Sequence, residues 1–264
     1  MGESFERHDA PLPALEEEIL DRNDLPLADT RRALRDLQRV NFWLLGRRSL
    51  RVTLMPLLLA DRGRPQTILD VAAGAGGSTA AMTRSAARRS VQTTVVSLDR
   101  KISHLVIGRQ QGHVERAVVG NAGQLPFRDG SFDWVVSSLF FHHLDRQAKT
   151  IVAREMCRLA RRGAVVIDLR RAKWPAWALR SFGPILGLGK IALGDGIVSI
   201  SRSWTVDEWR VFLADRGAQL RRRFPARVSI VLPPFDLRES ASRTSSSAAR
   251  EAEPGSFERA SASH

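Results

Sequence analysis

The chain has 264 residues, of which 43% are hydrophobic and 26% are charged. These proportions are ordinary for a globular protein, and they exclude a fibrous repeat, a disulfide scaffold and wholesale disorder. The formal net charge is +13, but the arginines are spread along the whole chain, so we interpret the charge as a basic, solvated surface. Nucleic acid, an anionic membrane and acidic substrates are the other partners that such a charge favours.

The first 60 residues predict a leader and two helices. Residues 1–27 have mixed charge and lack the apolar core of a secretion signal, so we expect a loosely ordered leader. Apolar residues recur at helical spacing from 28 to 45, and Gly46 is expected to end that helix. Residues 47–60 predict a second helix that is kinked or broken near Pro56.

The middle of the chain alternates short apolar stretches with helical ones. The expected strands are 67–72, 91–98, 115–119, 132–138 and 164–169, and the expected helices are 79–89, 103–111 and 147–160. This alternation predicts βαβ units and therefore a mostly parallel sheet with helices on both faces. Cys157, the single cysteine, is interpreted as a buried structural thiol. One cysteine allows no intramolecular disulfide, which favours a cytoplasmic setting, and it gives no spacing typical of a metal site.

Beyond residue 170 the pattern changes. Residues 173–200 form an apolar insertion, but Lys190 and Asp195 interrupt it, so it lacks the roughly 18 apolar residues of a membrane span. The remaining expectations are a helix from the capping box Thr205-x-x-Glu208 to about Asp215, a late antiparallel strand at 223–232 and a disordered tail at 238–264. Residues 28–237 are thus expected to form one domain.

The strongest local signal is Ile68-Leu69-Asp70-Val71-Ala72-Ala73-Gly74-Ala75-Gly76-Gly77-Ser78, an apolar strand that runs into a glycine-rich turn and a helix. Glycines let the backbone approach a ligand closely, and the first turn of a helix offers unpaired N–H groups. A tight turn without a ligand is the alternative at this point, because many α/β folds use one.

A second signal is Val95-Val96-Ser97-Leu98-Asp99-Arg100, in which an acidic residue ends the second strand. A carboxylate in that place can accept hydrogen bonds from both hydroxyls of a ribose, although a surface aspartate is the simpler alternative. A nicotinamide dinucleotide is disfavoured, because Thr79 occupies the place of the third glycine in G-x-G-x-x-G.

The third signal is Gly120-Asn121-Ala122-Gly123-Gln124-Leu125-Pro126-Phe127-Arg128-Asp129-Gly130-Ser131-Phe132-Asp133-Trp134-Val135-Val136. With the pattern D-x-x-x-G-x-G and the aspartate that ends a strand, the sequence resembles the class I S-adenosylmethionine-dependent methyltransferases. It is similar to their small-molecule branch, which includes ubiquinone and menaquinone C-methyltransferases and related phenol or lipid O-methyltransferases. The resemblance extends from about Arg39 to Arg170. It implies a Rossmann-like α/β sandwich with a seven-stranded, mostly parallel sheet, and S-adenosylmethionine as cofactor.

The resemblance also implies roles for individual residues. Asp70 would order the turn near the methionine amino group, and Asp99 would bind the ribose hydroxyls. The other cofactor-binding residues would be Ala72, Gly74 and Gly76 at the methionine and ribose, Arg100, Asn121 and Ala122 at the adenine, and Ser138 through its backbone. Two positions depart from the family pattern, because Ala72 stands where glycine is usual and Asn121 where aspartate is usual. Both departures are expected to weaken cofactor affinity without removing the site.

The candidate catalytic residues lie in Leu139-Phe140-Phe141-His142-His143-Leu144, after the fourth strand. Methyl transfer mainly requires alignment, but a hydroxyl acceptor must also lose its proton, and histidine suits that task. His143 is the preferred base and His142 the second choice; alternatively one histidine packs locally and the other only contacts the ligand. The turn Ser137-Ser138-Leu139-Phe140 differs from the Asn/Asp-Pro-Pro-aromatic turn of enzymes that methylate nucleobase amino groups.

Four residues are candidates for the acceptor pocket. Asn41 and Trp43 lie in the helix ahead of the first strand, which in the family covers the cofactor; simple packing against the sheet is the alternative. Trp174 and Trp177 lie in the apolar insertion, which is expected to wall the pocket, to touch an anionic membrane surface, or only to cover the sheet.

The sequence therefore predicts methyl transfer from S-adenosylmethionine to a small aromatic or lipophilic acceptor, with oxygen as the first choice of acceptor atom and carbon as the second. An RNA methyltransferase that uses the basic surface and a non-catalytic S-adenosylmethionine-binding protein are the rival predictions. The expected location is the cytoplasm, with peripheral contact to the inner face of the membrane as an alternative. The acceptor molecule and the oligomeric state are not specified by the sequence.

Overall fold

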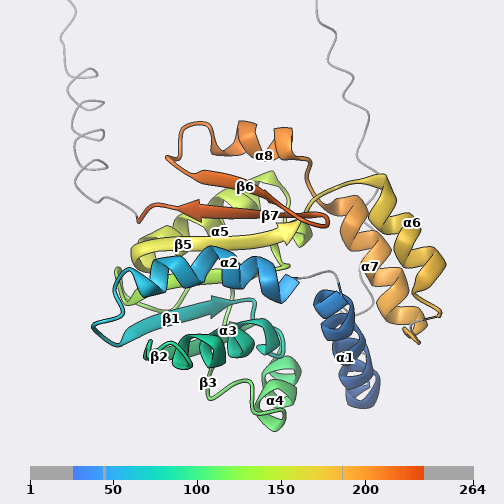
Figure 1. Ribbon diagram of the computed structural model, residues 1–264, viewed down its shortest axis with the longest axis horizontal. Coiled ribbons are helices and arrows are strands. Elements are labelled where there is room, and N and C mark those ends of the chain that lie inside the picture. The colour runs from blue at the N-terminus through green and yellow to red at the C-terminus, as the bar shows by residue number, and fades with distance from the viewer. Residues whose placement is uncertain (1–25, 44–45, 186, 235–264) are drawn as a thin grey trace, which may run out of the picture. The chain divides into compact units, whose positions relative to one another are not determined.

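A seven-stranded sheet is the centre of the computed structural model, which describes residues 26–43, 46–185 and 187–234 (Figure 1). The strand order is β3-β2-β1-β4-β5-β7-β6. The strands are β1 (Gln66–Val71), β2 (Thr93–Asp99), β3 (Arg116–Val119), β4 (Phe132–Ser138), β5 (Ala160–Leu169), β6 (Gln219–Arg223) and β7 (Arg227–Leu232). The first five strands pair in parallel, and β7 runs antiparallel to both β5 and β6. The expected Rossmann-like, mostly parallel sheet is therefore confirmed.

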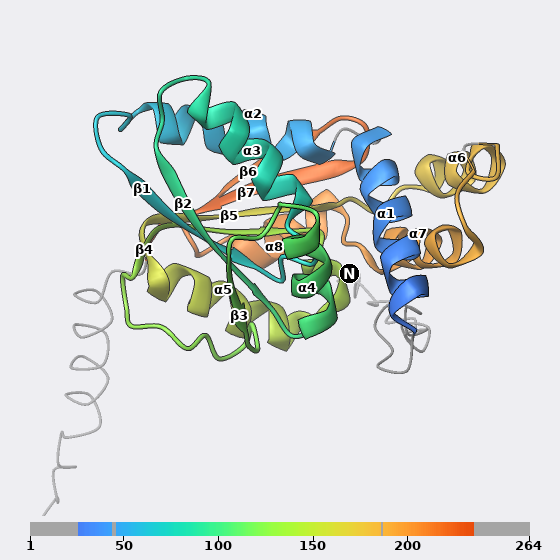
Figure 2. The ribbon, with the colours of Figure 1, turned by 90° about the horizontal axis from the view of Figure 1, so that it is seen from below.

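Helices cover both faces of this sheet. They are α1 (Leu27–Trp43), α2 (Gly46–Leu59), α3 (Gly77–Ala87), α4 (Ile102–Gln110), α5 (Arg146–Leu159), α6 (Lys173–Phe182), α7 (Lys190–Arg202) and α8 (Val206–Leu213). Figure 2 shows α2 and α3 on one side of the sheet and α5 on the other. The described residues all belong to one compact unit that ends at Pro234. The expected leader up to residue 25 and the expected tail at 238–264 lie outside the described residues.

Alternation along the strands creates two apolar cores. In β4, Trp134 and Val136 pack with Leu50 and Leu54 of α2 on one face. Val135, on the opposite face, belongs to the larger core that includes α5 and α8. Successive residues of a strand point to opposite faces, so a strand buried on both faces reads as one continuous apolar run.

The N-terminal helices differ from expectation at two points. Gly46 begins α2 instead of ending α1, and a Cβ there would lie 1.6 Å from Oδ1 of Asn41, so only glycine allows this close approach. Pro56 lies inside α2 without breaking it. Pro56 and Val52, four residues earlier, are both exposed, so water can bond the carbonyl that proline leaves without a partner.

Two strands were also incompletely predicted. The region 223–232 contains the second half of a hairpin, and its first half, β6, was not expected. β5 begins at Ala160, earlier than the expected residue 164. The capping box of Thr205 and Glu208 is confirmed, and the helix that it begins ends at Leu213, short of the expected Asp215.

Candidate active site

A cavity of about 350 Å³ opens where β1, β2 and β4 end. Seven of the sequence-predicted site residues line it: Ala72, Gly74, Asp99, Arg100, Asn121, Ala122 and His143. The lining residues that sequence reasoning missed are Leu34, Leu37, Leu98, Lys101, His104, Gly120, Leu139, Phe140 and Leu144. Of these, Lys101 and His104 lie two and five residues after Asp99. Their closeness to Asp99 in the sequence was a signal that could have placed them in the site.

The glycine-rich turn forms one wall of this cavity. Ala72, Gly74 and Gly76 all have positive φ angles, of 55°, 55° and 68°. A Cβ added at Gly74 would meet nothing within 4 Å, so this glycine borders open space. A Cβ at Gly76 would lie 2.7 Å from Cγ2 of Val114, and Gly76 is the N-cap of α3. Gly76 is thus required for packing and for the turn, and it is not among the residues that line the cavity.

Asp99 is held in place by the backbone around it. Its Oδ2 accepts a hydrogen bond from the Gly74 amide and its Oδ1 accepts one from the Lys101 amide, both at 2.8 Å. Nδ1 of His104 lies 3.5 Å from Oδ1. Burial alone would raise the pKa of Asp99, but His104 and the two amides outweigh burial and hold the pKa below its usual range. The cavity therefore contains a fixed, ionised carboxylate.

Asp70 lies in β1 below the turn and is almost fully buried. Burial raises the pKa of Asp70 from 3.8 to about 7, and the neighbouring charge of Asp99 adds to that rise. Its side chain is not part of the cavity lining. Asp70 is thus a buried carboxyl group with a raised pKa, and a nearby positive charge would favour its ionised form.

The predicted adenine edge and the end of β4 show two different arrangements. Oδ1 of Asn121 accepts a hydrogen bond from the Gly123 amide at 2.9 Å, so the amide oxygen already braces its own loop. Ala122 is buried beneath that loop. At the end of β4, the hydroxyl of Ser138 is buried and has no hydrogen-bond partner in the part of the chain that the structure describes.

The two histidines differ in their surroundings. His142 is buried, and its Nδ1 lies 2.6 Å from Oδ1 of Asp168. His143 is half-buried, lines the cavity and stacks on Phe140. The centroids of the two imidazole rings lie 4.3 Å apart, so His142, which is bound to Asp168, also contacts His143. Asp168 was not predicted from the sequence, because nothing near it in the chain marks it.

Two buried cations accompany Asp168. Lys149 of α5 donates a hydrogen bond to the carbonyl of Leu144. Burial lowers the pKa of Lys149 to about 8, and the charge of Asp168 opposes that shift. Burial also lowers the pKa of Arg227 to about 10, again against the charge of Asp168. The charge of Asp168 thus favours the protonated forms of both Lys149 and Arg227, and Asp145 and Glu208 act in the same direction on Lys149.

Comparison with known proteins identifies the domain. Residues 69–167 match the family model described as a methyltransferase domain. Residues 69–167 are therefore a methyltransferase domain, of the kind found in class I S-adenosylmethionine-dependent methyltransferases. No curated protein matches its sequence significantly.

Several solved structures are similar to this chain, and the first of those below shares its fold. A protein of Pyrococcus horikoshii OT3 is 18% identical, with a TM-score of 0.50 over 71% of this chain and 91% of that one. A SAM-dependent methyltransferase of Aquifex aeolicus is 16% identical, with a TM-score of 0.46 over 64% of this chain and 82% of that one. Magnesium protoporphyrin IX methyltransferase of Synechocystis PCC 6803, crystallised with bound SAH, is 13% identical, with a TM-score of 0.49 over 72% of this chain and 83% of that one.

The N-terminal helix covers the glycine-rich turn of the methyltransferase. Ala33 and Leu34 of α1 pack against Ala75 of the turn. Nδ2 of Asn41 donates to Oγ of Ser78 at 2.9 Å, and Nη2 of Arg227 donates to Oδ1 of Asn41 at 3.0 Å. Asn41 thus fastens α1 to α3 and β7 through both ends of its amide, and its place in the acceptor pocket stays a prediction.

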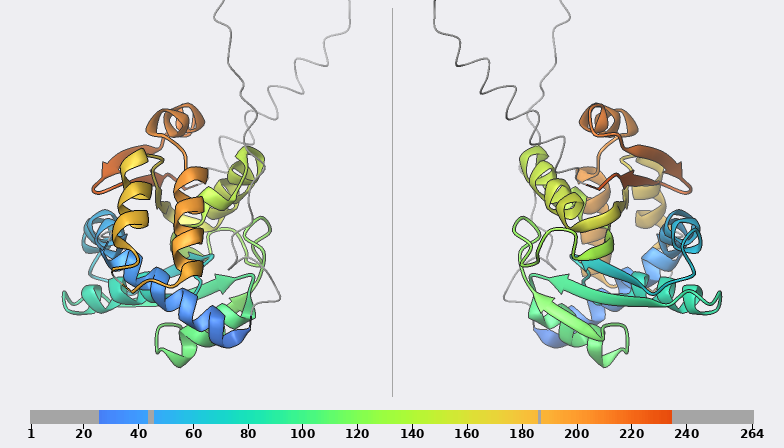
Figure 3. Two further views of the ribbon diagram at one scale, coloured as in Figure 1. Left: turned by 90° about the vertical axis from the view of Figure 1, so that its right-hand side faces the viewer. Right: turned by 90° about the vertical axis from the view of Figure 1, so that its left-hand side faces the viewer.

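Two of the other acceptor-pocket candidates, Trp174 and Trp177, are not among the residues that line the described cavity. Trp43 is the last residue of α1, and its side chain lies outside the described ones. Trp174 and Trp177 are on α6 and are exposed to solvent, and their role in the acceptor pocket stays a prediction. The apolar insertion in which they lie folds into α6 and α7, which Figure 3 shows beside α1.

Proposed function

We propose that this methyltransferase methylates a hydroxyl oxygen on a small aromatic or lipophilic acceptor, with His143 as the general base. The observation that carries the proposal is that His142, held by a buried contact of 2.6 Å to Asp168, also contacts the cavity-lining His143. A histidine whose neighbours are fixed in this way fits the role of a proton acceptor better than that of a packing residue.

The residues of the cavity fit S-adenosylmethionine. The ionised Asp99 would hold the ribose hydroxyls, and the open side of Gly74 leaves room beside it for the methionine part. Arg100 and Ala122 would flank the adenine. When bound, the cofactor supplies an electrophilic methyl carbon on a positively charged sulfur, and the sulfur keeps the electron pair of the broken bond.

The chain's own contribution is alignment and removal of a proton. Leu139, Phe140 and Leu144 line the cavity beside His143, so the acceptor would lie against an apolar wall with its hydroxyl near the imidazole. His143 would take the hydroxyl proton as the acceptor oxygen bonds to the methyl carbon. His142, held by Asp168, would position the ring of His143 through the contact between their faces.

Incubation of the full chain with labelled S-adenosylmethionine and a panel of phenols, quinols and RNA tests this proposal. We expect label in an ether of a phenol or quinol, and we expect His143→Ala to lower kcat by roughly 10²–10⁴-fold. Arg128→Ala, an exposed change away from the cavity, should leave kcat unchanged.

Three results would contradict the proposal. Label in RNA alone would favour the basic surface as the substrate platform. Label on a ring carbon would make carbon the acceptor atom. Binding of S-adenosylmethionine without transfer to any member of the panel would count against the acceptor class.

A further inference from the structure

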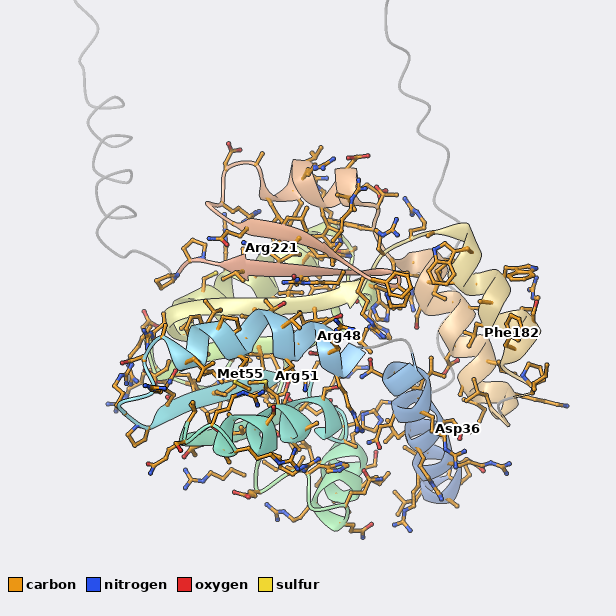
Figure 4. All side chains as sticks on the ribbon, viewed as in Figure 1. Asp36, Arg48, Arg51, Met55, Phe182 and Arg221 are labelled. Atoms are coloured by element: carbon orange, nitrogen blue, oxygen red, sulfur yellow. The ribbon has the colours of Figure 1, made fainter. Side chains whose placement is uncertain are left out.

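The geometry points to a second binding surface: the outer face of α6 and the turn that follows it dock on an anionic lipid bilayer. We call this surface the α6 face and define it by Trp174, Trp177, Phe182 and Ile185. These four side chains are 44%, 65%, 52% and 80% exposed. Figure 4 shows Phe182 at the outer edge of the molecule, beyond the end of the sheet.

The exposed aromatic residues of α6 are not the side chains by which this helix packs on the rest of the protein. α6 already buries its opposite side, where Leu179 packs with Leu188 and Ile200 in a separate apolar cluster. A Cβ at Gly196 of α7 would lie 2.7 Å from Cδ2 of Leu179, so the two helices are in close contact there. α6 therefore exposes large apolar side chains in addition to the side that it packs, next to the exposed Arg180 and Ser181. An ordinary surface helix presents mainly polar residues to water.

The composition of the α6 face matches a membrane interface. Tryptophan and phenylalanine prefer the headgroup region of a bilayer, and the rings of Trp177 and Phe182 contact each other edge to face with centroids 6.1 Å apart. Ile185, in the turn after α6, is the most exposed of the four and can reach furthest into the acyl region. An aliphatic tip has no stacking surface for a nucleic-acid base, which favours lipid over RNA.

The charges around the α6 face complement anionic lipid. The segment 170–202 contains six arginine or lysine residues and one acidic residue, Asp195. Asp195 is buried, so it presents no negative charge to a membrane, whereas Arg180 and Lys190 are exposed. Each basic residue close to an anionic surface strengthens binding.

Docking in this way would also bring lipophilic acceptors close to the active site, a consequence that rests on the proposed function. α7 packs against α6, against α1 and against the turn Phe141–His143 that carries both histidines. The pair of helices α6 and α7, whose outer face meets the bilayer, is therefore in direct contact through α7 with the turn that carries both histidines. No helix of the described ranges is long and apolar enough to span a membrane, so the proposed contact is peripheral.

Sedimentation of the full-length protein with lipid vesicles tests the docking proposal, and it needs neither cofactor nor acceptor. Vesicles of phosphatidylglycerol and phosphatidylcholine in equal parts should bind the protein, and vesicles of phosphatidylcholine alone should not. The double variant Trp177→Ser/Phe182→Ser should weaken binding by about tenfold or more. Val211→Ser on α8 is the matched control, because Val211 and Trp177 are both 65% exposed.

A second pair of variants tests the electrostatic part. Arg180→Glu should weaken binding to anionic vesicles several-fold, and Arg128→Glu, the same change at an exposed position of a loop outside α6, should not. Ile185→Ser gives an independent apolar test if the double variant unfolds, since Ile185 lies in a turn.

Four outcomes would overturn the proposal: no binding to anionic vesicles, equal binding to both kinds of vesicle, binding that the apolar variants leave intact, or equal loss in Val211→Ser. Dimers that form as concentration rises and disappear in the double variant would instead show that a second copy of the chain covers the α6 face. Because vesicle binding is independent of turnover, its failure would leave the methyl-transfer proposal untouched.

Discussion

His142 and Asp168 meet because neighbouring strands bring their ends together. β4 pairs with β5 so that Ser138 lies opposite Ile167, and the amide of Leu139 donates to the carbonyl of Ile167 at 2.8 Å. The turn after β4 therefore begins beside the residue before Asp168. The result is the contact of 2.6 Å between Nδ1 of His142 and Oδ1 of Asp168, at the same sheet edge as the cofactor cavity.

The first prediction concerns the charge of Asp168. Asp168→Asn should lower the free energy of unfolding by about 3 kcal/mol, because two buried cations, Lys149 and Arg227, lose the carboxylate that stabilises their charge. Urea denaturation measures the change. Adding Lys149→Met to Asp168→Asn should restore part of the lost free energy of unfolding. An unchanged urea midpoint in Asp168→Asn alone would show that Asp168 does not stabilise these cations.

The second prediction concerns the strained backbone at Ala72, which has a φ of 55°. A left-handed conformation costs a non-glycine residue about 1–2 kcal/mol. Glycine removes this strain, but its greater conformational entropy in the unfolded chain cancels roughly half of the gain in stability. Ala72→Gly should therefore stabilise the protein by about 0.5–1 kcal/mol.

Ala73 provides the control for that change, because its φ is not positive. Ala73→Gly should destabilise the protein by about 0.5–1 kcal/mol, the usual cost of glycine. The two adjacent alanines should thus respond with opposite signs in thermal unfolding. Destabilisation by both substitutions would show that Ala72 carries no strain.

The third prediction concerns pH and Asp70. Its pKa is raised from 3.8 to about 7 by burial, so the folded chain binds more protons than the unfolded chain between those values. The contribution of Asp70 to stability is therefore full below about pH 4 and is lost as the pH rises through 7. Asp70→Asn removes this loss, so the variant should gain a few kcal/mol relative to wild type between pH 5 and pH 8.

Other carboxyls have lowered pKa values and act in the opposite direction, so the informative quantity is the difference between variant and wild type at each pH. Asp207→Asn, at an exposed position of α8, is the control and should show only a small difference. A flat difference for Asp70→Asn would mean that Asp70 titrates normally in the folded chain.

Much of this fold could be predicted because its central strands are buried on both faces. The apolar run Trp134-Val135-Val136 marks β4, and the glycine turn marks the end of β1. β6 was missed because Gln219–Arg223 lies at the edge of the sheet with mostly exposed side chains. Edge strands need no apolar alternation, so periodicity does not reveal them.

The candidate site likewise contains residues that the sequence could predict and residues that it could not. Residues near the glycine turn and Asp99 are close in sequence to their motifs, and the cavity gathers most of them. Asp168, Lys149 and Arg227 come from β5, α5 and β7, and only the folding of the sheet brings them together. The sequence did not reveal that Asn41 bonds to Ser78 and Arg227, or that Trp174 and Trp177 are exposed. Sequence indicates that a side chain is polar or aromatic but not the direction in which it points.

Calorimetric titration of S-adenosylmethionine into the wild-type chain and into Asp99→Ala tests the central claim most directly, namely that the cavity at Asp99 and Gly74 is the cofactor site. Asp99→Ala should weaken binding by about 1–3 kcal/mol, because a charged acceptor of hydrogen bonds is lost. Unfolding of the variant must be measured in parallel, since Asp99 also holds the amides of Gly74 and Lys101. Equal affinity in a folded Asp99→Ala protein would place the cofactor elsewhere and contradict the account.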